Sequence, residues 1–541
     1  MSQEIPVLYG TETGNAADCA EQLAESIEAL GYASSAIDLA DFDCDDLCDL
    51  PLVFIVSSTH GNGDPPENAE ELMDFLKYDE PDLETVQFAV CGLGDTAYPY
   101  FAQCGKDFDK YMEQNGARRI LPRMDCDESF EVPFNDFKNS VVQYLRENDA
   151  SVRQFLGLST DHKAPEAPKA HIQKPQAALG SRENPFVGRL VKKMRLSGTG
   201  SKKETMHYEV DFLGVAVSYN SGDCFGVFPH NNPSEVDSIL SNFKLIGEEI
   251  VHWKEESLPI RTVLQTRACL QRISVDFLKL LATDSPKAKA AVDGGSQTMT
   301  EYLNEHHLLD ASTQSTVALD AQTLADHLYK IQPRLYSIAS SPETFPTTTH
   351  FCIETLRYTR NERPAEGVAS TWLADRMSSG DSLSLYLHPN NRFRLPTDDR
   401  PIIMIGPGTG IAPFRAFLQE KQSGAFQGDT WLFFGHQHAE QDYLYKSDIE
   451  RFRQDGILNK LDLAWSRDQQ DKVYVQHKMW ENKEELWSWI QRGASIYVCG
   501  AIRMGEDVDA VLRKVATHFG EDESVWMEEL DSSGRYLRDV Y

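Results

Sequence analysis

The sequence predicts an α/β multidomain chain in which two doubly wound domains flank a β-barrel interrupted by helices. Three observations predict this class. The first 148 residues alternate between short apolar runs and helical periodicity, residues 149–183 are polar and rich in Pro, Ala and Lys, and strand and helix alternation returns after Pro396. At 541 residues the chain is longer than one hydrophobic core usually serves, so several domains are expected.

The first domain, residues 1–148, is predicted from its apolar runs. Ile5–Tyr9 reads as a strand, and a helix follows in which apolar residues recur at helical spacing until Gly31 ends it. Leu52–Val56 and Val86–Val90 are continuous apolar runs, which are typical of parallel strands buried on both faces. This pattern predicts a doubly wound sheet.

The rest of the chain divides at changes in composition. Residues 149–183 cannot bury a core and are expected to form a flexible linker. Residues 184–395 show short alternating strands, and helical periodicity dominates from about 232 to 328, which predicts a barrel with a helical connecting subdomain. Residues 396–541 are expected to form the last α/β domain.

Composition excludes several classes of function. The ten cysteines are scattered without paired C-x-x-C sets, so neither zinc nor an iron-sulfur cluster is expected. The net charge of -32 disfavours nucleic acid and anionic membranes, and it fits a basic protein partner or simply solubility. No apolar run is long enough to cross a bilayer and no signal sequence is recognised, so we expect a cytoplasmic protein without a membrane anchor.

The segment Gly406-Pro-Gly-Thr-Gly-Ile-Ala-Pro-Phe-Arg415 follows the apolar run Pro401–Ile405 and predicts a strand that leads through a glycine turn into a helix. Such a turn brings backbone amides and the positive end of the helix dipole close to a phosphate. The spacing departs from G-x-G-x-x-G, and alone it would fit a tight connection equally well.

Three loops of the first domain follow predicted parallel strands and should meet at the carboxyl edge of one sheet, where such sheets bind ligands. The first loop, which contains Thr11 to Ala16, offers hydroxyls and backbone amides but no lysine, and this combination suits a phosphate monoester. Tyr98 could stack on a planar ring, and Asp95 could accept hydrogen bonds from a sugar chain. Singly each loop fits a plain connection, whereas together they favour an FMN pocket. Its expected residues are Thr11, Glu12, Thr13, Gly14, Asn15, Ala16, Ser58, Thr59, His60, Gly61, Leu93, Gly94, Asp95, Thr96, Ala97, Tyr98 and Phe101.

These loops resemble the FMN domain of the diflavin reductases. The resemblance spans nearly the whole chain, and it implies a flavodoxin-like domain, an FAD-binding barrel and a ferredoxin–NADP reductase-like nucleotide domain. Arg334-Leu-Tyr-Ser337 resembles the strand of that family that binds FAD, and Gly367-Val-Ala-Ser370 its second FAD phosphate segment. Without these motifs Tyr336 and Tyr358 would be read as barrel core. The FAD residues implied are Arg334, Leu335, Tyr336, Ser337, Cys352, Ile353, Glu354, Tyr358, Gly367, Val368, Ala369 and Ser370.

The last domain is similar to the pyridine-nucleotide domain of the same family. Arg467 and Lys472, with a hydroxyl and an aromatic face nearby, supply what a ribose 2'-phosphate and its adenine need, which favours NADPH over NADH. Taken one by one, these residues would fit a solvated loop. The residues expected at this site are Gly408, Thr409, Ser466, Arg467, Lys472, Val473, Tyr474, Val475, Gln476 and Asp507.

The resemblance also implies catalytic residues. Ser337, Cys499 and Asp539 correspond to the residues that in this family surround the nicotinamide and the flavin, and Tyr541 to the terminal aromatic that shields the flavin. Cys499 on an apolar strand would otherwise be read as core. No metal ligand set is expected.

The function implied is electron transfer from NADPH through FAD to FMN and then to a separate haem or iron-sulfur protein. The ending Asp-Val-Tyr541 and the run Trp465-Ser-Arg-Asp-Gln469 look most like the sulfite reductase branch of the family, whose acceptor is a sirohaem subunit that reduces sulfite to sulfide for cysteine biosynthesis. The alternatives are a cytochrome-type reductase that serves a haem monooxygenase or an iron-sulfur assembly protein, and a binding module that has lost its flavins.

Overall fold

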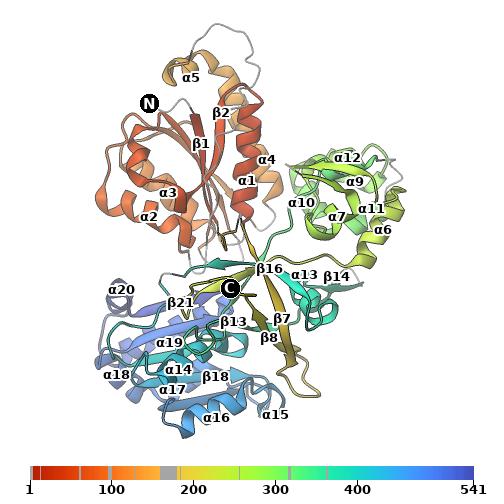
Figure 1. The fold of residues 1–541 in the computed structure, drawn as a ribbon. Coiled ribbons are helices and arrows are strands. Elements are labelled where there is room, and N and C mark those ends of the chain that lie inside the picture. Colours follow the sequence, from red (N-terminus) through yellow and green to blue (C-terminus); the bar gives the residue numbers. More distant parts are fainter. Residues whose placement is uncertain are drawn as a thin grey trace. The chain divides into compact units, whose positions relative to one another are not determined.

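A computed structural model describes residues 4–11, 14–59, 63–94, 100–127, 130–158, 179–182, 184–254, 256–314, 319–360, 363–390 and 392–541. The chain forms two units, one built from residues 1–173 and 230–332 and the other from residues 174–229 and 333–541 (Figure 1). In the part that the structure describes, no helix combines the length and the apolar character required to cross a membrane.

The first unit begins with a parallel sheet of order β2-β1-β3-β4-β5, with β6 paired to β4. This is the flavodoxin-like strand order, in which the strand sequence reverses beside β1. Alternate residues of each strand face opposite sides: Phe54 packs with α1 and α4, and Ile55 packs with α2 and α3. Figure 1 shows these helix pairs on opposite faces. The elements are β1 (Glu4–Gly10), α1 (Asn15–Glu28), β2 (Ala33–Asp38), β3 (Leu52–Ser58), α2 (Glu70–Asp74), β4 (Gln87–Leu93), α3 (Gln103–Gln114), β5 (Arg118–Arg119), β6 (Met124–Cys126) and α4 (Glu131–Glu147).

A further helix, α5 (Asp149–Phe155), covers the start of the segment expected to be a linker. Val152 and Leu156 are buried in the same cluster as α1 and α4, so the folded domain continues past residue 148. The cause is two apolar residues at helical spacing within a sequence that is polar on average. Residues 159–178 of the expected linker lie outside the described residues.

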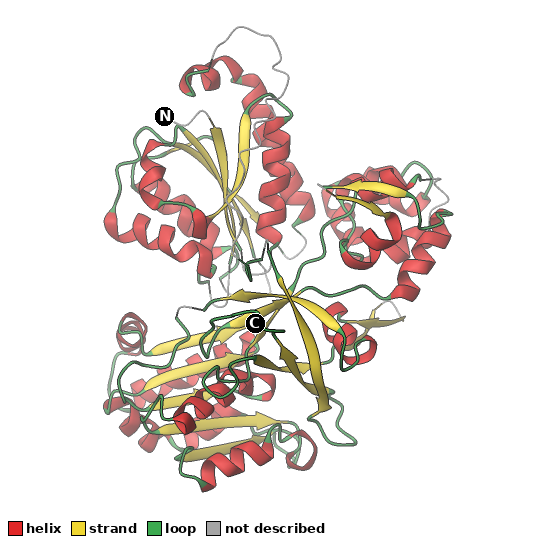
Figure 2. Cartoon of the chain, in the orientation of Figure 1, coloured by secondary structure: helices red, strands yellow, loops and turns green. Residues whose placement is uncertain are grey.

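The same unit contains the expected helical subdomain, which Figure 2 shows as a group of helices with one short hairpin. Side chains of Ser274 and Asp320 accept backbone N–H bonds of Phe277 and Thr323 and so begin two of its helices. Its elements are α6 (Pro233–Phe243), β10 (Ile250–Trp253), β11 (Glu256–Pro259), α7 (Ile260–Thr266), α8 (Val275–Leu281), α9 (Pro286–Asp293), α10 (Ser296–Glu305), α11 (Leu308–Thr313) and α12 (Ala321–Asp326).

The second unit begins with an antiparallel sheet of order β12-β9-β16-β7-β8-β13. A bridge between Ile338 and Phe351 joins the two ends of this order and closes the barrel, as predicted. The helical subdomain is inserted between β9 and β12. The elements are β7 (Phe186–Arg195), β8 (Thr205–Asp211), β9 (Cys224–Val227), β12 (Arg334–Ser337), β13 (Thr348–Glu354), the hairpin β14 (Arg357–Arg360) and β15 (Arg363–Glu366), α13 (Val368–Thr371) and β16 (Ser382–His388).

The last domain is a parallel sheet of order β19-β18-β17-β20-β21, so the strand sequence reverses between β17 and β20. Ile403 and Phe433 pack against α17 to α20 on one face, and Met404 and Phe434 pack against α14 and α16 on the other. The elements are β17 (Ile402–Ile405), α14 (Ile411–Ser423), β18 (Thr430–His436), α15 (Ala439–Asp442), α16 (Lys446–Gln454), β19 (Lys460–Trp465), α17 (Val475–Glu481), α18 (Lys483–Gln491), β20 (Ser495–Gly500), α19 (Ile502–His518), α20 (Glu523–Ser532) and β21 (Tyr536–Val540). Together these sheets confirm the predicted α/β multidomain class.

Two buried histidines lie where the barrel packs against this domain. The rings of His207 (β8) and His350 (β13) are 5.1 Å apart. His207 Nδ1 is 2.9 Å from the hydroxyl of Tyr445, and an N–H of Arg415 donates to His350 Nδ1 at 3.3 Å. Burial lowers the pKa of His207 to about 4, and burial together with the charge of Arg415 lowers the pKa of His350 to about 3.

These two pKa values predict acid sensitivity of the second unit. Because unfolding exposes imidazoles that bind protons near pH 6.5, the unfolded chain takes up protons that the folded chain does not. The stability contributed by the neutral rings is complete above about pH 6.5 and falls as the pH drops towards 4, by up to about 1.4 kcal/mol per pH unit for each ring.

Urea unfolding followed by tryptophan fluorescence at pH 7, 6 and 5 measures this dependence, since every tryptophan except Trp253 lies in the second unit. His350→Gln removes one of the two rings, so the pH dependence of the unfolding free energy should decrease by the amount that corresponds to the uptake of about one proton. Equal slopes in the two proteins would contradict the assignment.

Candidate functional site

The reversal point between β17 and β20 carries the predicted glycine turn. β17 ends at Ile405, and a short helical turn, Gly408–Gly410, leads into α14. A Cβ on Gly410 would lie 2.0 Å from the carbonyl oxygen of Cys499, and one on Gly406 would lie 2.4 Å from that of Gly410. Gly408 has φ +60°, and among the residues that the structure describes only His436 comes within 4 Å of its missing Cβ. The turn is therefore pressed against β20 on one side and open on the other, which fits a dinucleotide phosphate.

The three residues expected to be catalytic meet beside this turn. Cys499 (β20) and Asp539 (β21) are register partners in the parallel sheet. The hydroxyl of Ser337, the last residue of β12, donates to Asp539 Oδ2 at 2.9 Å, and the Cys499 thiol donates to the same oxygen at 3.6 Å. Burial first, and the charge of Asp539 second, raise the pKa of Cys499 well above its usual value, so the thiol stays protonated.

Cys224 was missed by the sequence analysis. It faces Ser337 across the β9–β12 pair, and its thiol donates to the Ser337 hydroxyl at 3.8 Å. An apolar strand with one cysteine carries no signal that distinguishes a site residue from core.

Tyr541 lies over the glycine turn. Its backbone N–H donates to the Gly500 carbonyl at 3.0 Å, and its hydroxyl is 3.0 Å from that of Thr409. The residue as a whole is 56% exposed, so it lies at the surface of the domain. This placement fits the shielding role that the resemblance implies.

The residues expected to bind the 2'-phosphate lie at the end of β19 and before α17. Ser466 is buried, whereas Arg467 and Lys472 are exposed, and among the described residues neither cation has a paired side chain. The neighbouring acid, Asp468, is occupied by His438 Nδ1 at 2.8 Å and by the N–H of Ala439 at 2.9 Å. Two unpaired cations beside a satisfied carboxylate fit an anionic ligand.

The other residues of this group take three kinds of position. Val475 is buried under β18 and β19, and Val473 packs at the edge of the same core. The ring of Tyr474 is exposed, as a stacking partner for adenine would be. Gln476 donates to Asp507 at 3.0 Å, which joins α17 to α19.

The FAD residues expected on the barrel fall into two groups. Arg334 and Tyr358 are exposed, and Leu335, Tyr336, Gly367 and Val368 are half-buried. Cys352 and Ile353 are buried in opposite faces of β13, where their side chains pack as core. Glu354 pairs with Lys203, Ala369 is buried, and the Ser370 hydroxyl accepts the N–H of Leu356 at 3.0 Å.

One arginine beside the second phosphate segment has unused hydrogen-bonding capacity. Arg376 donates to Glu366 at 2.7 Å and to the Val368 carbonyl at 3.2 Å, while its buried Nε has no partner in the described part of the chain. A buried N–H without a partner is costly, so this group fits an anionic ligand at the segment.

The expected FMN loops meet at the carboxyl ends of β1, β3 and β4. Thr11 Oγ1 accepts the N–H of Gly14 at 2.9 Å, the Ser58 hydroxyl donates to Gly10 O at 3.3 Å, and the Thr59 N–H donates to Leu93 O at 2.9 Å. Gly94 is pressed against Ala102 N, which lies 2.4 Å from the position of its missing Cβ. The structure describes part of the expected FMN site, namely Thr11, Gly14, Asn15, Ala16, Ser58, Thr59, Leu93, Gly94 and Phe101. The other expected residues lie outside the described residues; they are Glu12, Thr13, His60, Gly61, Asp95, Thr96, Ala97 and Tyr98.

Asn68 supports the first of these loops and was also missed. Its Oδ1 accepts the N–H of Thr11 at 2.9 Å, and its amide donates to Asp38 at 2.8 Å. No motif surrounds this asparagine, so only the folded contact identifies it.

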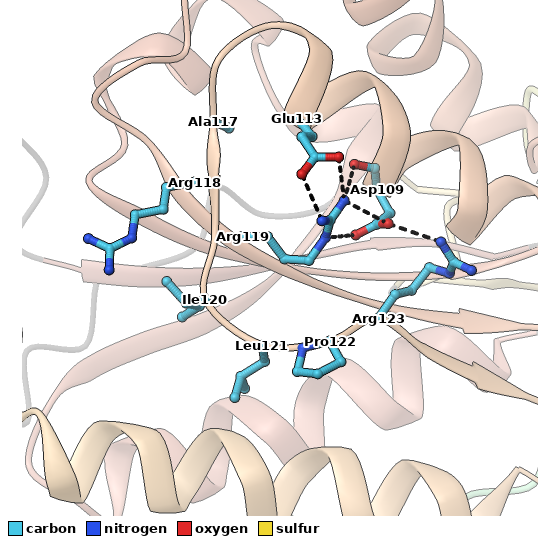
Figure 3. Close-up of a pocket in the computed structure, with 9 residues that line it drawn as sticks. All are labelled: Asp109, Glu113, Ala117, Arg118, Arg119, Ile120, Leu121, Pro122 and Arg123. Carbon is cyan, nitrogen blue, oxygen red and sulfur yellow. Dashed lines mark hydrogen bonds and ion pairs between the residues drawn. The ribbon is translucent and has the colours of Figure 1, made fainter.

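A surface hollow of about 760 Å³ in the same domain lies along the loop between β5 and β6. Figure 3 shows Arg119 between Glu113 and Asp109, with Arg118 pointing to the other side. Asp109 accepts from Arg119 at 2.6 Å and from Arg123 at 2.9 Å. Both arginines pair with acids. We therefore interpret the charged residues that line this hollow as a structural network of ion pairs and not as a ligand site.

Comparison with known families agrees with this architecture. Residues 7–134 match the flavodoxin family, residues 180–271 the FAD binding domain family and residues 404–510 the oxidoreductase NAD-binding domain family. These matches support FMN, FAD and NADPH as cofactors, and the three modules in this order define a diflavin reductase.

Full-length relatives identify the branch. The chain is 37% identical to the sulfite reductase (NADPH) flavoprotein alpha-component of Mannheimia succiniciproducens over 99% of this chain and 90% of the relative. It is 36% identical to that of Bacillus subtilis, over 100% and 90% of the two chains, and 35% identical to that of Aliivibrio fischeri, over 99% and 89%. The chain belongs to the sulfite reductase flavoprotein alpha-component family of oxidoreductases.

The contact between the glycine turn and β20 predicts the effect of one methyl group. Gly410→Ala would place its Cβ against the Cys499 carbonyl. We expect NADP⁺ to bind at least about tenfold more weakly, a change of about 1.4 kcal/mol measurable by calorimetry.

Gly424→Ala, at the other end of α14, is the matched control. Gly424 has φ +89°, and the end of Gln427 is the one described group close to its missing Cβ, so alanine should strain the helix end without touching the turn. Unchanged affinity in Gly410→Ala, or equal losses in both variants, would contradict the role of the turn.

Proposed function

We propose that this protein carries electrons from NADPH through FAD to FMN and then to a separate sirohaem subunit of sulfite reductase, in the cytoplasm. The observation that carries the proposal is the convergence of Ser337, Cys499 and Asp539 beside the glycine turn. When bound, NADPH supplies a hydride, and the two flavins convert its two electrons into single-electron transfers. The similarity to sulfite reductase flavoproteins supports sulfite reductase as the system that this protein serves.

We assign the chemical roles from the geometry of the trio. The Asp539 carboxylate is held by two donors at the edge of the sheet, where a fixed negative charge favours a positive charge that develops on a pyridine ring. The Ser337 hydroxyl and the protonated Cys499 thiol hold this carboxylate in place. The ring of Tyr541 covers the turn and has to move aside before a nicotinamide can reach the trio.

The exposed cations Arg467 and Lys472 supply the selectivity for NADPH. Each would form a charge-assisted contact with a 2'-phosphate, and NADH has no such group. The loops at β1, β3 and β4 would hold FMN, and the barrel segments around Arg334 and Gly367 would hold FAD.

The partner protein is proposed from the family and from chemistry. The described part of the chain offers no site that we assign to sulfite reduction, so a second protein would carry the metal centre. An acceptor assay separates the candidates: sulfide should form from sulfite and NADPH when a sirohaem sulfite reductase subunit from the same organism is added. Cytochrome c reduction without sulfide formation would favour the cytochrome-type alternative. A purified protein without flavin absorbance would contradict the whole proposal.

Arg467→Ala tests the nucleotide assignment. The KM for NADPH should rise by at least about tenfold while the KM for NADH stays within about a factor of two, because only NADPH offers the phosphate. Steady-state ferricyanide reduction measures both constants. Arg492→Ala serves as the control, since Arg492 is an exposed arginine of the same domain that pairs with Asp429. Parallel changes for both nucleotides would remove Arg467 from the phosphate site.

A further inference from the structure

Arg415 lies one turn into α14, directly after the glycine turn, and is only 8% exposed. Its guanidinium makes three directed contacts: with Asp448 Oδ2 at 2.8 Å, with the Ala339 carbonyl at 2.6 Å and with His350 Nδ1 at 3.3 Å. It also lies 4.8 Å from the centre of the Tyr445 ring. Asp448 and Tyr445 belong to the nucleotide domain, and Ala339 and His350 belong to the barrel.

Gln419, one helical turn further along α14, contacts the same barrel segment. Its Oε1 accepts the N–H of Ser341 at 2.9 Å, and the residue is 3% exposed. The segment 339–341 is bound from its other side by β13, because the Ala339 N–H donates to the His350 carbonyl at 2.8 Å. The segment begins two residues after Ser337.

The buried cluster around Arg415 could be mistaken for a metal centre. His207, Glu209 and His350 bring ligand atoms within 4.8 Å of one another. Lys192 already pairs with Glu209 at 2.8 Å. Arginine can only donate, so His350 Nδ1 accepts its hydrogen bond. In a neutral His350 the ring proton then lies on Nε2, and this nitrogen has no lone pair to offer a metal. The cluster therefore accommodates the cation of Arg415.

We propose that Arg415 and Gln419 are positioning residues for the nicotinamide reaction, which fix the barrel segment that carries Ser337 against the sheet that carries Cys499 and Asp539. This inference rests on the proposed function. The serine comes from one domain and its two partners from another, so their alignment depends on contacts that join the domains. An error of about 1 Å in such an alignment can cost about a hundredfold in rate.

Two substitutions test the proposal in the full-length flavoprotein. Arg415→Lys keeps the charge but loses the fork that spans Ala339, His350 and Asp448. Gln419→Leu removes the acceptor with little change in volume. For both we expect the rate of flavin reduction by NADPH, followed by stopped-flow absorbance, to fall by about tenfold or more while the KM for NADPH stays within about a factor of two. The isotope effect with NADPH deuterated at C4 should rise.

A further variant serves as the control. Arg451→Lys alters an exposed arginine that contacts the same Asp448 carboxylate at 3.1 Å and should leave the rate unchanged.

Flavin content and the thermal midpoint are measured for every variant. Wild-type rates in Arg415→Lys and Gln419→Leu would overturn the proposal, as would loss of FAD from both, because the contacts would then serve folding. If the wild-type protein itself fails to reduce ferricyanide with NADPH, the proposed function fails, and this inference fails with it.

Discussion

The carboxylate of Asp539 is the point on which the candidate site depends. Its position follows from the parallel pairing of β20 and β21, which sets Asp539 beside Cys499, and from the barrel strand β12, which ends with Ser337 donating to the same oxygen. A buried thiol and a hydroxyl both donate to this carboxylate and fix its position. The glycine turn lies beside this carboxylate site, because Gly410 packs directly on the carbonyl of Cys499.

The pairing of charged side chains distinguishes the proposed nucleotide site from the rest of the protein. The protein has a net charge of -32, and two of its arginines pair with acids, Arg415 with Asp448 and Arg119 with Asp109. Arg467 and Lys472 differ from these, because both are exposed without a paired side chain in the part of the chain that the structure describes. An acidic protein that leaves two cations without a described partner between β19 and α17 offers a local site for an anion within a surface that repels anions generally.

Sequence patterns predicted the parts of this architecture that depend on local periodicity. Continuous apolar runs identified β3, β4 and β17, and the glycine pattern after Ile405 identified the turn that leads from β17 into α14. The trio of Ser337, Cys499 and Asp539 came from resemblance, because its members lie far apart in the chain.

The remaining features depend on tertiary contacts that no local pattern reports. Cys224 and Asn68 act on residues 113 and 57 positions away. Helix α5 arises from two apolar residues inside a segment that is polar on average. The burial of His350 follows from the packing of two domains, and Arg415 belonged to a recognised motif without a hint that it binds the barrel.

The role of the Asp539 carboxylate is tested most directly by the rate of flavin reduction by NADPH in Asp539→Asn, followed anaerobically in a single turnover. Asparagine keeps the shape and an acceptor but removes the charge, so we expect a rate lower by at least about tenfold, with NADP⁺ affinity within about a factor of two of the wild type. A wild-type rate in a variant that retains both flavins would contradict the central role of this carboxylate.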